Sequence, residues 1–224
     1  MKPILMGIAF ACTAPAVTHA QDNPVVIYQF EMVITQNQLI DRGIASRFDA
    51  LTVGTPGLLR MEVAQQESIY PFFSTETTKF FSVHSLELSS GILETAGSPS
   101  VYPSSQFTTD MHVANDSLFA APDTFHDFFG NVIALDAPDI GFSLLFMSDQ
   151  VTGGFSNVFD DAQLPTGEQL TQLGSRSYFF QTSYDPSARI TYAITNVTST
   201  FIPAPASAAL LTLAALTTTR RRRH

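Results

Sequence analysis

The chain has 224 residues, in which 20 aspartates and glutamates outnumber 11 lysines and arginines, so its formal net charge is −9 at pH 7. An acidic protein is poorly suited to bind nucleic acid or an anionic membrane surface, because both carry negative charge. Cys12 is the single cysteine, which excludes an intrachain disulfide and any metal site built from several cysteines.

The N-terminus has the three parts of a secretory signal peptide. Lys2 supplies positive charge, residues 4–14 form a short apolar stretch, and Thr18-His19-Ala20 supplies the small residues of a cleavage site. We therefore expect residues 1–20 to direct export through the Sec machinery, with cleavage between Ala20 and Gln21. Cys12 could also be read as a lipoprotein acceptor, but the apolar run before it is short, so ordinary signal-peptide sequence is favoured.

Residues 21–202 are expected to form one domain. Removing residues 1–20 and 203–224 takes away five of the eleven basic residues and no acidic one, so the remaining domain has a net charge of −14. Apolar and polar side chains alternate in it, as in Tyr28-Gln29-Phe30-Glu31-Met32, and this pattern predicts strands with one buried face. Strands are expected at residues 28–34, 59–63, 80–88, 106–114, 131–135, 140–148, 178–184 and 188–201.

Turn residues separate these segments, for example Gly54-Thr55-Pro56-Gly57 and Asp136-Ala137-Pro138-Asp139. Many short strands with such turns are typical of an all-β fold, which we expect to be an antiparallel β-sandwich or jelly-roll-like domain. One short helix is expected within residues 164–173, because Thr166 can cap it and Leu170 and Leu173 would share one face.

A histidine between two carboxylates offers the best local candidate for chemistry. Asp123 and Asp127 flank His126, and Asp110 and His112 lie upstream. Such an imidazole could act as a general base or help bind a metal. However, Asp110 and His112 fall on the expected polar face of their strand, and the segment around His126 is typical of a loop. We therefore favour solvated side chains over a catalytic or metal site, and expect no cofactor.

Two ligand classes stay open. The oxygen-rich stretches at residues 115–117 and 157–161 lack the Asp-x-Asp-x-Asp-Gly spacing of a calcium loop, so turn formation is their favoured role. Carbohydrate, including a matrix polysaccharide, could contact Tyr70, Tyr102 or Tyr184, although nineteen phenylalanines and no tryptophan favour a core role for the aromatic residues.

The C-terminus, residues 203–224, has three parts in order. Pro203-Ala204-Pro205 is extended and ends the preceding strand. Residues 207–219 form an uncharged run of small and apolar residues suited to a helix in lipid. Arg220, Arg221, Arg222 and Arg223 follow it, and such a cluster resists translocation. Thirteen helical residues rise about 20 Å against a hydrocarbon core of about 30 Å, so a temporary anchor is expected.

This order resembles the PEP-CTERM sorting domain of Gram-negative bacterial exoproteins, a Pro-Glu-Pro motif followed by an apolar helix and an arginine cluster. In this chain Ala204 takes the place of the central Glu. The resemblance implies recognition by exosortase, a transpeptidase-like membrane enzyme, after transient insertion in the inner membrane. A weaker pattern, residues 51–56 between the first two strands and Leu164-Pro165-Thr166 near the end, is similar to a β-sandwich domain found in such exoproteins, and it implies no catalytic residue.

The sequence therefore predicts an exported cell-surface or extracellular-matrix protein whose ectodomain is not an enzyme, since no nucleophile, zinc-protease or phosphate-loop motif is present. The alternative is a secreted hydrolase, or a lectin-like protein that binds calcium or carbohydrate, with the tail used only for delivery. Convergence of Asp110, His112, His126 and Asp127 would favour this alternative.

Overall fold

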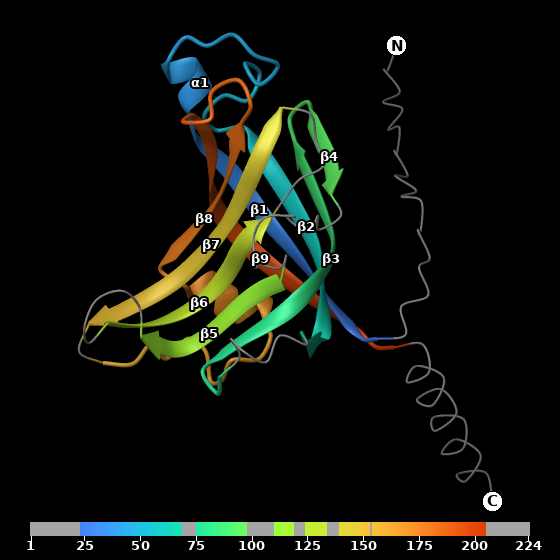
Figure 1. Cartoon of the computed structure of the whole chain (residues 1–224), viewed down its shortest axis with the longest axis vertical. Coiled ribbons are helices and arrows are strands. Elements are labelled where there is room, and N and C mark those ends of the chain that lie inside the picture. Colours follow the sequence, from blue (N-terminus) through green and yellow to red (C-terminus); the bar gives the residue numbers. More distant parts are fainter. Residues whose placement is uncertain are drawn as a thin grey trace, which may run out of the picture.

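The computed structural model describes residues 23–68, 75–97, 110–118, 124–133, 139–152 and 154–204. These residues form nine strands and two short helices (Figure 1). The strands are β1 (Val25–Asn37), β2 (Pro56–Glu67), β3 (Thr78–Ser90), β4 (Leu93–Gly97), β5 (Asp110–Leu118), β6 (Thr124–Ile133), β7 (Ile140–Thr152), β8 (Ser175–Thr182) and β9 (Arg189–Ile202). The helices are α1 (Gln38–Asp41) and α2 (Gly167–Gln172).

The strands form a single antiparallel sheet that closes on itself. Around it β1, β2, β3, β5, β6, β7, β8 and β9 pair in that order, and β9 pairs again with β1. The expected all-β antiparallel class is confirmed. The arrangement differs from a sandwich of two packed sheets, because hydrogen bonding continues around all eight strands. It also differs from a jelly roll, because all strands consecutive in the chain except β4 and β5 are neighbours in the sheet.

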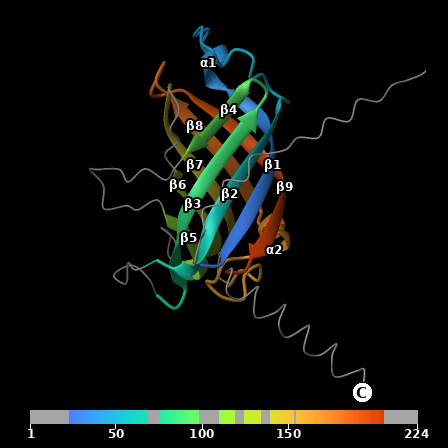
Figure 2. The same ribbon diagram turned by 90° about the vertical axis from the view of Figure 1, so that its right-hand side faces the viewer.

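Strand β4 is an addition to this closed sheet. On one edge of β3, residues 78–82 pair with β5, whereas residues 86–90 pair with β4. The opposite edge of β3 pairs with β2. Figure 2 shows β4, β3, β2, β1 and β9 side by side. The split allows β5 to leave β3 and cross the lower part of the molecule in Figure 1.

Aromatic side chains fill the interior of the closed sheet. Inward-pointing residues alternate along the strands between their bulges, and Tyr28, Phe30, Phe129, Tyr178, Phe180 and Tyr192 are fully buried. The ring centroids of Tyr28 and Phe129 lie 5.2 Å apart, and those of Tyr178 and Tyr192 lie 5.8 Å apart. Rings at these distances pack in favourable tilted arrangements. The interior is therefore a packed core.

The loop after α1 covers one end of the sheet. The Asn37 side chain accepts hydrogen bonds from the amides of Leu39 and Ile40 and donates to the carbonyl oxygens of Phe48 and Leu51, both at 3.0 Å. A buried Asn that satisfies both its oxygen and its nitrogen fixes the loop tightly. Phe48 and Leu51 consequently lie in the core.

The segment that contains α2 covers the other end. Phe159, Leu170 and Leu173 from this segment are buried in the core. The hydroxyl of Tyr28 donates to the carbonyl oxygen of Pro165 at 2.7 Å. Thr166 caps α2 and forms a capping box with Gln169, so the predicted helix and its cap are confirmed.

Two parts of the strand prediction fail. The segment around His126, expected to be a loop, belongs to β6, which begins at Thr124 and not at residue 131. The short strand β4 was not anticipated, because Leu93 is its single large apolar side chain. Both errors have one cause: the sheet tolerates polar residues where the fold supplies hydrogen-bond partners or an open edge.

Candidate functional site

Asp110 and His112 lie on the outer face of β5, opposite the buried Met111 and Val113, as their spacing predicted. The expectation that they are solvated is wrong for Asp110, which is 5% exposed and accepts a hydrogen bond from the Ser82 hydroxyl at 3.1 Å. His112 is half-buried because its ring stacks on Phe80, with centroids 4.9 Å apart.

His126 and Asp127 point to opposite faces of β6, since successive residues of a strand alternate. Asp127 is fully buried and accepts hydrogen bonds from three amides, those of Asp116 at 3.0 Å, Val158 at 3.1 Å and Phe159 at 2.8 Å. His126 instead stacks on Phe128 on the outer face and is only 4% exposed, so the expectation of solvated side chains is wrong for both residues. The structure therefore does not bring the pair together as an imidazole and its orienting carboxylate.

The remaining weak metal candidate, Asp123, lies outside the described residues. Within the part of the chain that the structure describes, no group of three or more His, Cys, Asp or Glu side chains is placed to hold a metal ion. Asp127 has a different role, because its three amide contacts join the β5 bulge and the segment before α2 to β6.

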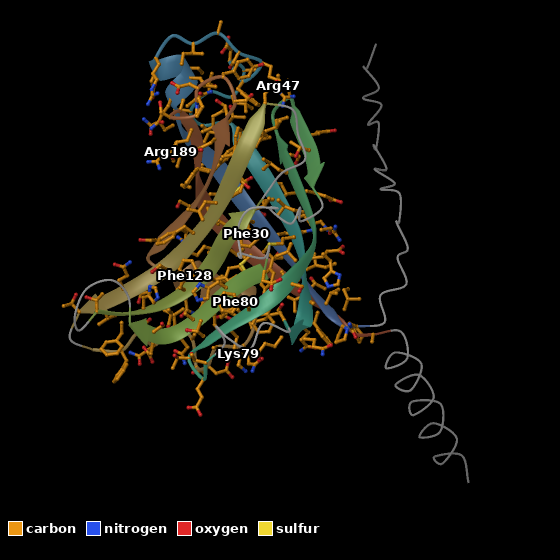
Figure 3. The ribbon with its side chains drawn as sticks, viewed as in Figure 1. Phe30, Arg47, Lys79, Phe80, Phe128 and Arg189 are labelled. Carbon is orange, nitrogen blue, oxygen red and sulfur yellow. The ribbon has the colours of Figure 1, made fainter. Side chains whose placement is uncertain are left out.

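Five rings form a continuous cluster on the outer face of β3, β5, β6 and β7, which we call the outer ring cluster: Phe80, His112, His126, Phe128 and Phe146. Figure 3 labels two of them, Phe80 and Phe128. Phe128 is central, with its ring centroid 5.0 Å from that of His112, 5.7 Å from that of His126 and 5.4 Å from that of Phe146. Gly130 leaves space for this ring, because a Cβ there would lie 3.0 Å from the tip of Phe128 and 2.2 Å from the Leu145 carbonyl oxygen.

The two imidazoles of the outer ring cluster are neutral at pH 7. Burial, as the larger cause, and the neighbouring His126 together lower the pKa of His112 to about 4. Burial also lowers the pKa of His126, against the smaller raising effect of Asp127. Because burial disfavours the charged form, these rings pack as apolar groups. Sequence analysis did not identify this cluster, because its rings come from four strands and the segment with His126 and Phe128 was expected to be a loop.

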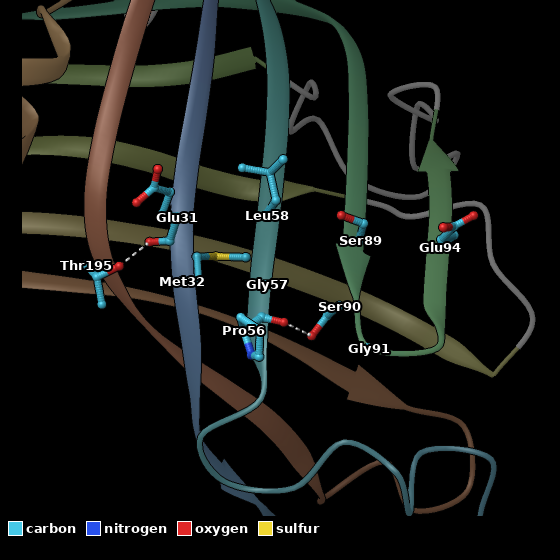
Figure 4. Close-up of a pocket in the computed structure, with 10 residues that line it drawn as sticks. All are labelled: Glu31, Met32, Pro56, Gly57, Leu58, Ser89, Ser90, Gly91, Glu94 and Thr195. Carbon is cyan, nitrogen blue, oxygen red and sulfur yellow. Dashed lines mark hydrogen bonds between the residues drawn. The ribbon is translucent and has the colours of Figure 1, made fainter. Parts of the chain in front are cut away.

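A shallow groove of about 530 Å³ crosses the outer face of β1, β2, β3 and β4 (Figure 4). Glu31, Leu58, Ser89 and Glu94 line it with exposed side chains. A second hollow of about 360 Å³ shares part of this lining and adds Arg60, which pairs with Glu62 at 2.6 Å and Glu87 at 3.6 Å. No sequence motif marked this groove, because its residues come from separate strands.

The first and last strands place both ends of the domain at one corner. Val25 pairs with Ile202 and Val26 with Phe201 in the β1–β9 ladder, and Figure 1 shows the two strands leaving the sheet together. Phe201 is 52% exposed and Ile202 is 42% exposed. Pro203 and Ala204 follow directly, outside any helix or strand.

The other predicted sorting residues lie outside the described residues, namely Ala20, Gln21, Pro205 and Arg220, Arg221, Arg222 and Arg223. The same holds for the expected apolar helix of the tail, and for Tyr70 and Tyr102. Among the residues that the structure describes, no helix has the length and apolar character needed to cross a membrane.

Tyr184 is 42% exposed, and its hydroxyl donates to the Asp139 carboxylate at 3.2 Å, so it helps fix a turn.

The chain as a whole matches no protein-family model, no curated protein and no solved structure.

Proposed function

We propose that the protein is exported and held at the cell surface or in the extracellular matrix through its C-terminal tail, with residues 21–202 as a non-enzymatic ectodomain. The signal peptide directs Sec export. The apolar run 207–219 then inserts transiently in the inner membrane, and an exosortase-type enzyme acts near Pro203-Ala204-Pro205.

The pairing of Val25 with Ile202 is the observation that carries this proposal. It places Val25, which follows the predicted cleavage site closely, beside Ile202, which directly precedes the predicted sorting motif. A leader and a tail that leave from one corner can both reach the same membrane without any strand of the closed sheet opening. The exposed turn residues at the opposite end then stay clear of the membrane.

The packed interior supports a binding or scaffolding ectodomain. Loops cover both ends of the closed sheet, and aromatic rings fill it. A partner must therefore contact the outer surface, where the groove lined by Glu31, Leu58 and Glu94 and the outer ring cluster lie.

Cell fractionation and intact-mass analysis of the native protein test this function. The wild type should lose both residues 1–20 and part of the tail, and should pass from the inner membrane to the surface fraction. A variant that lacks residues 203–224 should lose the leader but appear as soluble periplasmic or secreted protein. Replacement of the four arginines by glutamine should shift the protein toward the truncated variant's distribution, because the stop to translocation is removed.

The variant Ala204→Glu is the matched control, since it restores the central residue of the related motif without altering the apolar run. It should be processed at least as fully as the wild type. If the wild type keeps an intact C-terminus and reaches the same compartment as the truncated form, the proposed sorting role is refuted.

A further inference from the structure

The outermost residues of β9 are apolar on both faces of the strand. Phe201 and Ile202 are consecutive, so their side chains point in opposite directions, and yet they are 52% and 42% exposed. Their β1 partners, Val26 and Val25, are also apolar. Val25 is only 4% exposed, and both valines pair with β2 on their other edge. The projection that the domain does not cover therefore consists of Phe201 and Ile202, the last two residues of β9, which we call the terminal stem.

The terminal stem carries no charge, in contrast to the rest of this acidic domain. From Ile190 to Ile202 strand β9 has no charged residue, and in β1 the first charged residue is Glu31. An anionic lipid surface repels carboxylates. The uncharged terminal stem therefore adds no repulsion of its own, and Glu67 at the same end of β2 is paired with Lys79 at 3.7 Å.

The connection between the stem and the tail is short. Four residues, Pro203 to Ala206, separate Ile202 from the apolar run that begins at Ser207. Five Cα-to-Cα steps span at most about 17 Å when fully extended. Whenever the run is inserted, Ile202 must lie within this distance of its first residue.

The short length of the apolar run favours a still closer approach of the terminal stem to the membrane. Residues 207–219 rise only about 20 Å as a helix, against a hydrocarbon core of about 30 Å. A short span is matched by moving flanking residues into the membrane interface or by thinning the bilayer. The arginine cluster can occupy the interface at one end of the run. At the other end the nearest large apolar side chains are those of Ile202 and Phe201.

We propose that the terminal stem is a membrane contact: while the tail is inserted, Phe201 and Ile202 lie in the headgroup region of the bilayer and orient the domain upright on it. This inference rests on the proposed function, since it requires the tail to enter the membrane. The opposite end of the sheet, with Val53 68% exposed in the turn before β2, then points away from the lipid.

Site-specific labelling of the full chain in inner-membrane vesicles tests the contact. Cys12 is the single cysteine of the full chain, so in a Cys12→Ser background Ile202→Cys and Val53→Cys can each carry one polarity-sensitive fluorophore. The label at position 202 should emit at shorter wavelength, and a lipid-borne nitroxide should quench it several-fold more strongly than aqueous iodide does. The label at position 53 should show the reverse order.

The outcomes separate the two proposals. If the chain stays in the membrane fraction but iodide quenches the label at position 202 as strongly as the label at position 53, the membrane contact is overturned and the sorting proposal stands. If neither quencher reaches position 202, a protein partner covers the stem, which also overturns the lipid contact. If the chain never enters the membrane fraction, both proposals fail.

A second variant tests the membrane contact without a label in the terminal stem. Phe201→Ser combined with Ile202→Ser removes the apolar groups at positions that are already exposed, so folding should be retained. A label at Asn196, further from the membrane on the same strand, should then report a wider range of tilts by fluorescence anisotropy. An unchanged anisotropy would contradict the orienting role.

Discussion

Oδ2 of Asp127 accepts a hydrogen bond from the amide of Phe159 at 2.8 Å, and this contact joins the segment that closes one end of the sheet to a strand in its wall. The same oxygen accepts from the amide of Val158, and Oδ1 accepts from that of Asp116. A fully buried carboxylate is stable in such a place only because several donors replace its water shell.

Asp127→Asn should therefore destabilise the domain by about 3 kcal/mol, since an amide NH₂ would face at least one backbone donor and leave it unpaired. Urea unfolding of the protein without its leader measures the change. Asp160→Asn, at an exposed position in the same segment, should stay within about 0.5 kcal/mol of the wild type. Equal effects of the two substitutions would show that the three amide contacts contribute little.

Gly130→Ala should cost about 2 kcal/mol or more, because the new Cβ would lie 2.2 Å from a backbone oxygen of β7 and the sheet must shift to admit it. Thermal unfolding reports the loss. Gly154→Ala is the matched control, since its Cβ would meet the nearest side-chain atom at an ordinary 3.4 Å. A wild-type melting temperature for Gly130→Ala would contradict the close packing of Phe128 over this position.

Acid should destabilise the domain through His112. Its pKa is about 4 in the folded protein against an ordinary value of 6.5. Between these values the unfolded chain binds the proton and the folded chain does not, so stability falls as pH drops from 6.5 to 4. Urea midpoints measured across this range should show the decline.

His112→Phe should remove part of that decline, because a phenyl ring can stack between Phe80 and Phe128 without titrating. At pH 7 the variant should be at least as stable as the wild type, since Nε2 of His112 is buried without a hydrogen-bond partner among the described residues. A variant with the same pH dependence as the wild type would show that other groups cause it.

Thr166→Ala should cost about 1 kcal/mol, because the hydroxyl of Thr166 accepts from the Gln169 amide at 3.2 Å and caps α2. Thr166→Ser keeps the oxygen and should retain most of the stability. Chemical denaturation compares the three proteins, and an alanine variant equal to the serine variant would exclude a contribution from the cap.

The strands with regular alternation were predictable, and so was α2, because a threonine cap and two leucines on one face are local signals. Strand β6 was not. His126 and Asp127 looked like loop residues. The amides of Val158 and Phe159, which make a buried Asp127 acceptable in a strand, become its neighbours only in the folded domain.

Closure of the sheet was also beyond sequence analysis. The alternation in β1 and β9 predicts one buried face for each strand but does not name its neighbour, and the pairing of Val25 with Ile202 joins residues at opposite ends of the domain. The outer groove could not be predicted for the same reason, since Glu31 and Glu94 line one groove only because of the order of the strands in the sheet.

The β1–β9 ladder also sets the order in which the domain can be completed. During synthesis β1 emerges first and β9 last, so β1 has an unpaired edge until nearly the whole domain has been made. An open edge invites pairing with other chains. The strand that removes this hazard is β9, the last one to be made, so the sheet can close only when residues up to Ile202 are available.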